Sequence, residues 1–197
     1  VHSGDSIAVY PPYNLSDIML DKIIECSTQL ALSLKTKGLI NIQFLVFHNE
    51  LYVIEVNPRA SRTIPYISKV TGVPMVELAT KIMVGAKLKK LGYGTGLYKS
   101  SPYVAVKVPV FSFEKLNDVN SQLGPEMKST GEVLGIGKTI EEALFKGLVS
   151  AGFKLCHPTK QKHAGVYFTV NDQDKFEILG LAKKFSDLGL NIYATKG

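Results

Sequence analysis

Glu55, Asn57, Arg59 and Arg62 stand close together in the stretch V-I-E-V-N-P-R-A-S-R (53–62). The two arginines are the only ones in the chain, and the rest of its 23 strong cations are lysines. A guanidinium presents a planar fork of donors that matches phosphate or carboxylate, which an ammonium cannot reproduce. The clustering therefore predicts an anionic ligand, with phosphate as the favoured class and chance as the competing interpretation.

This stretch ends the second strand of a predicted hairpin. Residues 41–47 and 51–57 are rich in β-forming residues, and H-N-E (48–50) joins them, which predicts an antiparallel pair. We expect Phe47 to pair with Leu51, so that one face of the hairpin is apolar and can pack on a helix. The opposed pairs of that face would be Ile42 with Val56, Phe44 with Ile54, and Val46 with Tyr52.

The other face of the hairpin is polar at the end away from the turn. The same register sets Gln43 opposite Glu55, and Asn41 opposite Asn57. Hard cations such as Mg²⁺ prefer oxygen ligands, commonly one or two carboxylates completed by phosphate oxygens and water. Gln43, Glu55 and Asn57 are therefore candidate ligands of such a cation; the alternative is a solvated, purely structural hairpin end.

Helices must support this hairpin. Ser16 can cap a helix with one apolar face, which we expect to continue until Gly38 stops it. Pro74 opens a second helix, and Gly85 follows it. Together with the hairpin, these elements predict an α+β architecture in which helices cover an antiparallel sheet.

A further strand and helix are expected later in the chain. Residues 103–111 read as a strand, at a sheet edge or ending at Pro109, because proline cannot donate to a ladder. Thr139 and Glu142 form a capping box for a helix. The stretch G-I-G-K-T (135–139) lacks the glycine spacing of a phosphate-binding P-loop, so we do not interpret it as one.

The C-terminal part changes pattern. Residues 154–163 have little apolar periodicity and predict a linker. A strand at 165–170, a helix at 176–188 and a strand at 190–195 then predict a β-α-β unit. The unit ends at Gly197, which suggests the start of a small α/β domain.

Composition excludes some function classes. The net charge is +6, but the lysines are scattered and no basic run is interleaved with aromatics, so we expect no nucleic-acid partner. No apolar run approaches the roughly 18 residues of a membrane span, so we expect no membrane insertion. Cys26 and Cys156 fit no metal or redox spacing and suit a reducing cytoplasm. Because the chain begins at Val1, we expect a processed or excised fragment.

Five motifs resemble one family. They are H-S-G-D-S (2–6), N-I-Q-F (41–44), I-E-V-N-P-R-A-S-R-T (54–63), S-K-V-T-G-V-P (68–74) and L-G-P-E-M-K-S-T-G-E-V (123–133). In this order and wording they resemble the large subunit of carbamoyl-phosphate synthase over essentially the whole chain. The resemblance implies the C-terminal lobe of its second ATP-grasp half at 1–157. It also implies the start of its methylglyoxal-synthase-like regulatory domain at 158–197.

The resemblance also implies an activity. The second half of that subunit phosphorylates carbamate with ATP, giving carbamoyl phosphate for pyrimidine and arginine biosynthesis. Gln43, Glu55 and Asn57 would be Mg²⁺ or Mn²⁺ ligands that bridge the ATP phosphates, and the first two would also contact ATP. Arg59 and Arg62 would steady the transferred phosphoryl group and carbamate, as catalysis by charge neutralisation requires.

The remaining site residues would lie near the ends of the chain. The resemblance places Val1, His2 and Ser3 at the nucleotide. Within the regulatory part, which makes the enzyme allosteric, it implies three positions that hold effector phosphates: Thr169, Lys175 and Thr195. Effector identity stays open, because some relatives have Ser in place of the first.

The resemblance further implies partners and leaves alternatives. The other ATP-grasp lobe, the first ATP-grasp half and a glutaminase small subunit would complete the enzyme, so the chain alone is expected not to turn over. Another ATP-grasp ligase, such as a biotin-dependent carboxylase, shares E-x-N-P-R but continues differently after it. A non-catalytic regulatory or interaction module is the other alternative. The nitrogen donor, glutamine or ammonia, and the oligomeric state are not determined.

Overall fold

The computed structural model describes most of the chain, namely residues 2–113, 118–154 and 164–195. Contacts divide the chain into two units, Val1–Gly152 and Phe153–Gly197. The predicted linker lies almost entirely outside the described residues. The predicted domain boundary after residue 157 lies there too and stays a prediction.

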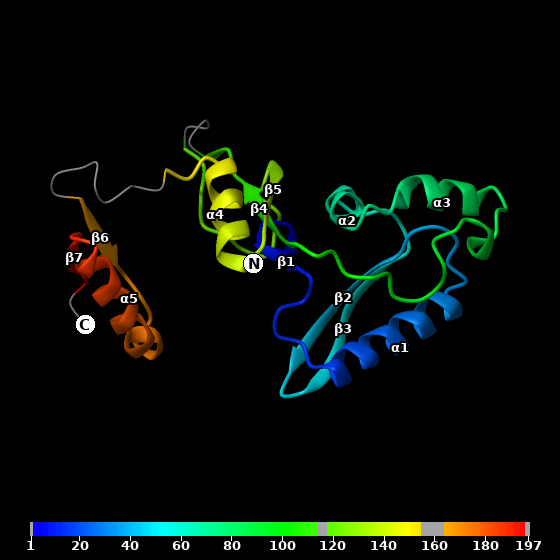
Figure 1. Cartoon of the computed structure of the whole chain (residues 1–197), viewed down its shortest axis with the longest axis horizontal. Coiled ribbons are helices and arrows are strands. Elements are labelled where there is room, and N and C mark those ends of the chain that lie inside the picture. The colour runs from blue at the N-terminus through cyan, green and yellow to red at the C-terminus, as the bar shows by residue number, and fades with distance from the viewer. Residues whose placement is uncertain (1, 114–117, 155–163, 196–197) are drawn as a thin grey trace. The chain divides into compact units, whose positions relative to one another are not determined.

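The core of the first unit lies between a three-stranded sheet and one helix (Figure 1). β4 (Val104–Val110) is the central strand, with β1 (Ala8–Tyr10) on one side and β5 (Gly131–Gly137) on the other, both antiparallel to it. α4 (Ile140–Ser150) packs on this sheet through apolar side chains. The fully buried residues of this core are Val106, Val108 and Ala143.

The central place of β4 corrects one prediction. Because it contains Pro109, the strand is predicted to lie at a sheet edge or to end at Pro109; instead it has a neighbour on each side, and it ends one residue later, at Val110. β1 pairs only as far as Lys107, so Pro109 lies beyond the last residue that β1 contacts in the ladder. At that position β5 is the one neighbouring strand among the described residues, and a proline is tolerated where pairing is single-sided.

The glycines of the G-I-G-K-T stretch bring β5 close to α4. A Cβ at Gly135 would overlap the carbonyl oxygen of Ala143, and one at Gly137 would lie 2.8 Å from the Ala143 nitrogen. The stretch therefore serves strand–helix packing, in agreement with its exclusion as a P-loop. The predicted helix cap is confirmed, because Thr139 Oγ1 accepts a hydrogen bond of 3.3 Å from the Glu142 nitrogen.

The predicted hairpin is confirmed at the end that carries the polar residues. β2 (Asn41–Phe47) and β3 (Glu50–Asn57) are antiparallel, and Gln43 stands opposite Glu55. Asn41 opposite Asn57 and Ile42 opposite Val56 also agree with the prediction.

Towards the turn, the predicted register is wrong. The loop is His48-Asn49 rather than three residues, and its φ angles of 48° and 61° match the twist of a tight hairpin. A register shift after Gln43 compensates, so that Phe44 stands opposite Val53. The predicted pairs Phe44–Ile54, Val46–Tyr52 and Phe47–Leu51 are replaced by Phe44–Val53, Leu45–Tyr52, Val46–Leu51 and Phe47–Glu50.

The first predicted helix forms but ends early. α1 (Asp17–Ser33) is capped by Ser16, whose Oγ accepts a hydrogen bond of 3.3 Å from the Met19 nitrogen. It ends before Gly38 because Lys35 takes a left-handed φ of 49°, which breaks the helical hydrogen bonding.

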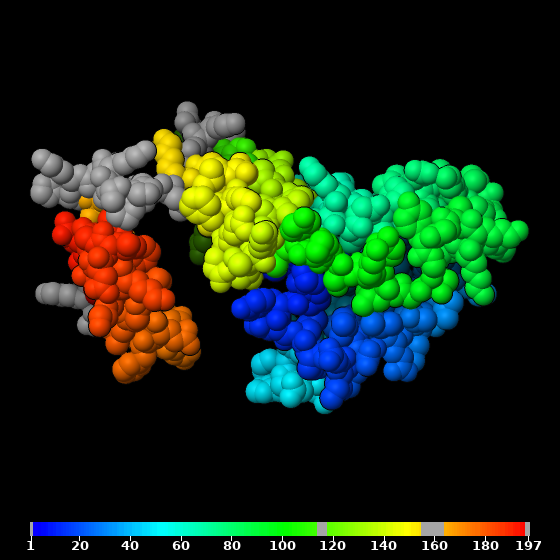
Figure 2. Space-filling view, viewed as in Figure 1, coloured from blue at the N-terminus to red at the C-terminus, as the bar shows by residue number. Residues whose placement is uncertain are grey.

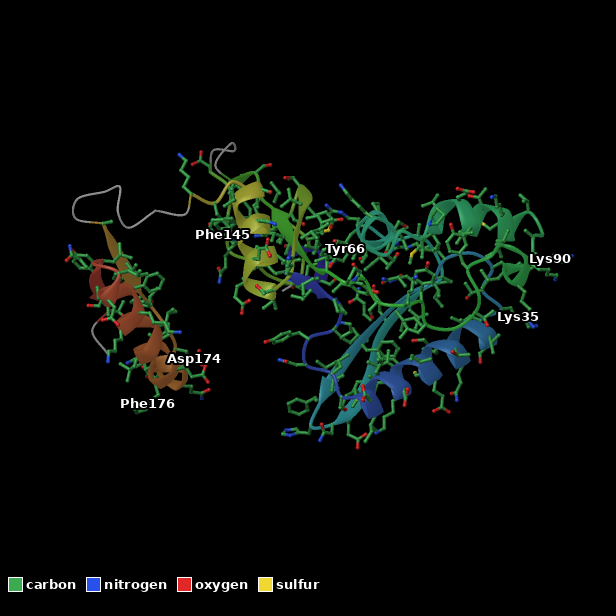
Figure 3. All side chains as sticks on the ribbon, in the orientation of Figure 1. Lys35, Tyr66, Lys90, Phe145, Asp174 and Phe176 are labelled. Carbon is green, nitrogen blue, oxygen red and sulfur yellow. The ribbon has the colours of Figure 1, made fainter. Side chains whose placement is uncertain are left out.

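Two further helices follow the hairpin. α3 (Met75–Met83) begins after Pro74, as predicted. α2 (Thr63–Thr71) has no counterpart among the predictions. Its Tyr66, labelled in Figure 3, is 7% exposed. The Tyr66 hydroxyl donates a hydrogen bond of 3.0 Å to the carbonyl oxygen of Ala105. The bond fixes α2 to the central strand of the sheet.

The second unit is the predicted β-α-β. β6 (Gly165–Phe168) and β7 (Asn191–Ala194) are parallel, and α5 (Lys175–Asp187) connects them. No helix within the described ranges is long and apolar enough to cross a membrane. The described residues also include the short 3₁₀ turns η1 (Ser3–Asp5), η2 (Leu88–Lys90) and η5 (Asp172–Asp174).

Candidate functional site

The hairpin brings the three candidate cation ligands together. Gln43 Nε2 donates to Glu55 Oε1 at 3.2 Å, and Asn57 Nδ2 donates to the same oxygen. The alternation of β3 places Glu55 and Asn57 on one face, and the register places Gln43 beside them. One carboxylate is thus flanked by two side-chain amides.

This donor set fits a cation that arrives with phosphate. It offers one carboxylate and two amide oxygens, once the amides turn away from Glu55, and Mg²⁺ completes such a set with phosphate oxygens and water. Among the described residues, no group of three His, Cys, Asp or Glu side chains could hold a metal. The trio itself contributes a single carboxylate, which is fewer charged ligands than an all-protein cage commonly has.

The start of the chain joins this site. Gln43 Nε2 also donates to Ser3 Oγ at 3.3 Å. The first residues, dark blue in Figure 2, lie against later segments of the same unit, and the His2 nitrogen donates to the Gly124 carbonyl at 3.0 Å. Two of the three residues predicted at the nucleotide are thus beside or near the trio; Val1 lies outside the described residues.

Both arginines lie in the exposed segment between β3 and α2. Arg59 Nη1 donates to the carbonyl oxygen of Ala60 at 2.9 Å, and Arg62 Nη1 lies 2.8 Å from Met127 Sδ. Within the described part of the chain, neither guanidinium forms a salt bridge. Among the described residues no carboxylate pairs with either charge, so both guanidinium groups keep donors that an anion could use.

Sequence reasoning missed two buried charged residues. Asp5 is 5% exposed, and its two carboxylate oxygens accept hydrogen bonds of 2.8 Å from the nitrogens of Lys128 and Ser129. Burial alone would raise the pKa of Asp5, but these bonds outweigh it and lower the pKa. Lys107 is 6% exposed, and burial lowers its pKa. The sequence does carry a signal for Lys107, because it is the single lysine inside the apolar run 103–111.

In the second unit, the predicted effector residues lie at one end of the sheet. Thr169 follows β6 and Thr195 follows β7, and the Thr195 nitrogen donates to the Phe168 carbonyl at 3.3 Å. Lys175 begins α5, and its Nζ lies 2.7 Å from Asp172 Oδ1. The carboxyl ends of parallel strands and the start of the connecting helix thus meet there.

The known proteins that are similar to this chain agree with its motifs. Residues 1–91 match the family described as "Carbamoyl-phosphate synthase L chain, ATP binding domain". The chain is 55% identical over 197 residues to the carbamoyl phosphate synthase large chain of Clostridium beijerinckii, and 56% identical over 195 residues to that of Clostridium botulinum. These alignments cover 100% and 99% of this chain.

Among solved structures, a biotin carboxylase domain of a single-chain bacterial carboxylase is 25% identical, with a TM-score of 0.49. The alignment covers 53% of this chain and 25% of that chain, and so partial an overlap does not assign a fold.

The relatives are much longer than this chain, which spans 18% of the length of each of the two. The similarity nevertheless extends through both units, from the N-terminal turn to β7. The resemblance inferred from the motifs is therefore confirmed: over its whole length, the chain is related to the carbamoyl phosphate synthase large chain.

Proposed function

We propose that the first unit supplies one wall of a site that phosphorylates carbamate with ATP and Mg²⁺ or Mn²⁺, giving carbamoyl phosphate. One observation carries this proposal: Gln43 joins Ser3, from the N-terminal turn, to Glu55, from β3, in a single polar network. The match of residues 1–91 to an ATP-binding domain supports a nucleotide as the ligand.

The side chains divide the work by chemistry. Gln43, Glu55 and Asn57 would hold the cation, which supplies charge neutralisation at the ATP phosphates when bound. Arg59 and Arg62 would bind the transferred phosphoryl group and carbamate through fixed guanidinium donors. Such donors stabilise charge that develops on equatorial oxygens during transfer.

Relatedness to a longer protein supports proposals about the whole enzyme. We assign the first unit to the C-terminal lobe of an ATP-grasp fold, whose opposite lobe the rest of the large subunit would supply. A glutaminase small subunit would deliver nitrogen, and the product would serve pyrimidine and arginine biosynthesis in the cytoplasm. With one wall of the site, the chain by itself is not expected to turn over.

The second unit would begin a methylglyoxal-synthase-like regulatory domain. Thr169 and Thr195 follow neighbouring parallel strands, and their hydroxyls would bind an effector phosphate. Lys175 would add a positive charge. In the structure, its Nζ forms an ion pair with Asp172 Oδ1 at 2.7 Å. Binding of a phosphate would therefore compete with this ion pair, a weak one at an exposed position.

The test is Glu55→Gln in the full-length protein that contains this chain. The variant keeps the shape of the side chain but removes its charge, so carbamoyl phosphate formation from carbamate and Mg-ATP should fall by about 100-fold or more. Glu50→Gln is the matched control, because Glu50 is an exposed glutamate at the turn end of the same strand. It should retain normal activity.

Near-normal activity of Glu55→Gln would refute the ligand assignment. Loss of activity in both variants to the same degree would also contradict it, because the effect would then follow from damage to β3. Binding of Mn²⁺ and ADP, measured on the same variants, separates loss of the cation site from loss of a later step.

A further inference from the structure

We propose that Asp5 and Lys107 are positioning residues, which hold the turn of residues 2–6 at the place where Ser3 meets Gln43. The inference rests on the proposed function, because Gln43 belongs to the proposed nucleotide and cation site. Both residues act through the backbone of the turn and of a distant segment, so their effect on the nucleotide is indirect.

Asp5 ties the turn to the segment that follows Gly124. Its Oδ2 accepts from the Lys128 nitrogen and its Oδ1 from the Ser129 nitrogen, each at 2.8 Å. Hydrogen bonds to an ionised carboxylate are stronger than neutral ones, and two of them fix both oxygens. The side chain is 5% exposed, so water cannot replace these partners without opening the segment.

Lys107 holds the turn from the sheet. Its Nζ donates to the carbonyl oxygen of Gly4 at 3.3 Å, and Ser129 Oγ donates to the same oxygen at 3.2 Å. The carbonyl next to Ser3 is thus bound from β4 and from the distant segment together. Because Gly4 lies directly after Ser3, this restraint limits where the serine hydroxyl can go.

Stability alone does not account for a lysine here. Lys107 lies in the central strand and is 6% exposed, and an apolar side chain could fill the position without burying a charge. Burial lowers the pKa of Lys107, and the charge of Arg62 adds to this, while the charges of Glu132 and Asp5 act in the opposite direction. An apolar residue could not donate a hydrogen bond to the Gly4 carbonyl oxygen, as Lys107 does.

The same distant segment also reaches an arginine of the site. Met127 Sδ lies 2.8 Å from Arg62 Nη1, and a Cβ at Gly4 would lie 2.7 Å from that sulfur. Met127 therefore lies beside both the turn and the arginine. A shift of the turn would move Ser3, the partner of Gln43, and would also displace Met127, the neighbour of Arg62.

The experiment uses Asp5→Asn and Lys107→Met in the full-length protein, with Mn²⁺ and ADP as the probe. Asparagine replaces one acceptor by a donor, and methionine keeps the length of lysine without its N–H groups. Hydrogen exchange of peptides spanning residues 2–7 and 41–47, measured against ADP concentration, reports binding at this site. The dissociation constant should rise about 10-fold in each variant, as loss of supporting contacts does elsewhere.

Tyr66→Phe is the matched control. It also removes a buried hydrogen bond to β4, at Ala105, but leaves Gly4 and Ser3 untouched. The control should bind Mn²⁺ and ADP as the unmodified protein does, even if its melting temperature falls. Phosphorylation of ADP by carbamoyl phosphate, the reverse of the proposed reaction, should show the same pattern in the KM for ADP.

Two results would overturn the inference. If Asp5→Asn and Lys107→Met bind ADP as the control does and lose only thermal stability, the two residues are purely structural. If the unmodified protein shows no nucleotide-dependent protection, or Glu55→Gln keeps it, the proposed function fails and the inference falls with it. Should either variant not fold, Ser129→Ala, which removes one bond to Gly4, must still weaken binding.

Discussion

Ser3 and Gln43 lie 40 positions apart in the chain and are joined by a hydrogen bond of 3.3 Å, in which the Gln43 amide donates to the serine hydroxyl. The same amide nitrogen donates to Glu55 at 3.2 Å. The N-terminal turn and the β2–β3 hairpin therefore meet at one side chain. The carboxylate of Glu55 is therefore connected to the turn through Gln43.

This relationship predicts the effect of Ser3→Ala. Once the Gln43 amide has turned away from Glu55, the Ser3 hydroxyl can still hydrogen-bond to it and hold it in place; loss of one such bond, about 0.5–1.5 kcal/mol, should weaken ADP binding by up to about 10-fold. Isothermal titration with Mn²⁺ and ADP measures it. Ser6→Ala is the control, because Ser6 bonds to the His2 carbonyl in the same turn but not to the hairpin. Equal losses in both variants would point to a general disturbance of the turn.

A second prediction concerns the geometry of the arginine donors. In the full-length protein that contains this chain, Arg62→Lys keeps the positive charge but loses the planar fork, so kcat/KM for carbamoyl phosphate formation should fall by about 100-fold. Lys69→Arg, at the other end of α2, makes the reverse change away from the site and should be silent. An Arg62→Lys variant with normal kinetics would mean that charge alone suffices.

A third prediction concerns alkaline pH. Burial, followed by the charges of Tyr10 and Glu132, raises the pKa of Tyr66 to about 12. A raised pKa favours the neutral phenol in the folded state. The resulting stability is complete below the unfolded pKa of about 10 and is lost as the pH rises towards about 12.

Urea unfolding between these pH values should therefore show a steeper loss of stability in the unmodified protein than in Tyr66→Phe. At neutral pH, the variant should be less stable by about 1 kcal/mol, the net value of one hydrogen bond. Parallel pH profiles for the two proteins would show that the phenol is not buried against Ala105.

A fourth prediction concerns the contact between β5 and α4. A methyl group at Gly135 would overlap the Ala143 carbonyl, so Gly135→Ala should destabilise the protein by about 1–3 kcal/mol. Gly131→Ala, in the same strand, would place its Cβ 3.9 Å from the Val110 Cβ, an ordinary contact. Thermal unfolding should separate the two variants, and equal melting temperatures would mean that α4 can move away.

Local patterns predicted much of the scaffold. The alternation of β2 and β3 was enough to place Glu55 and Asn57 on one face with Gln43, because strand period is set by the backbone. Thr139 was enough to start α4, since a cap acts within one turn of its own helix. The β-α-β order followed from short periodic runs in the same way.

Other features depend on contacts between segments that lie far apart in the sequence. The place of β4 at the centre of its sheet depends on β1 and β5, which come from distant parts of the chain, and a proline could not reveal it. The pairing of β2 with β3 near the turn also differs from the prediction, because the His48-Asn49 loop is one residue shorter than the predicted loop.

By itself, the sequence determined that Gln43, Glu55 and Asn57 share one face of the hairpin, and it determined the relationship to a carbamoyl phosphate synthase large chain. Only the tertiary structure decided that Ser3 reaches Gln43, and that Asp5 and Lys107 are buried beside Gly4. The reason is physical: hydrogen-bond periodicity is local, whereas the burial of a charge depends on segments separated by 103 and 123 positions along the chain.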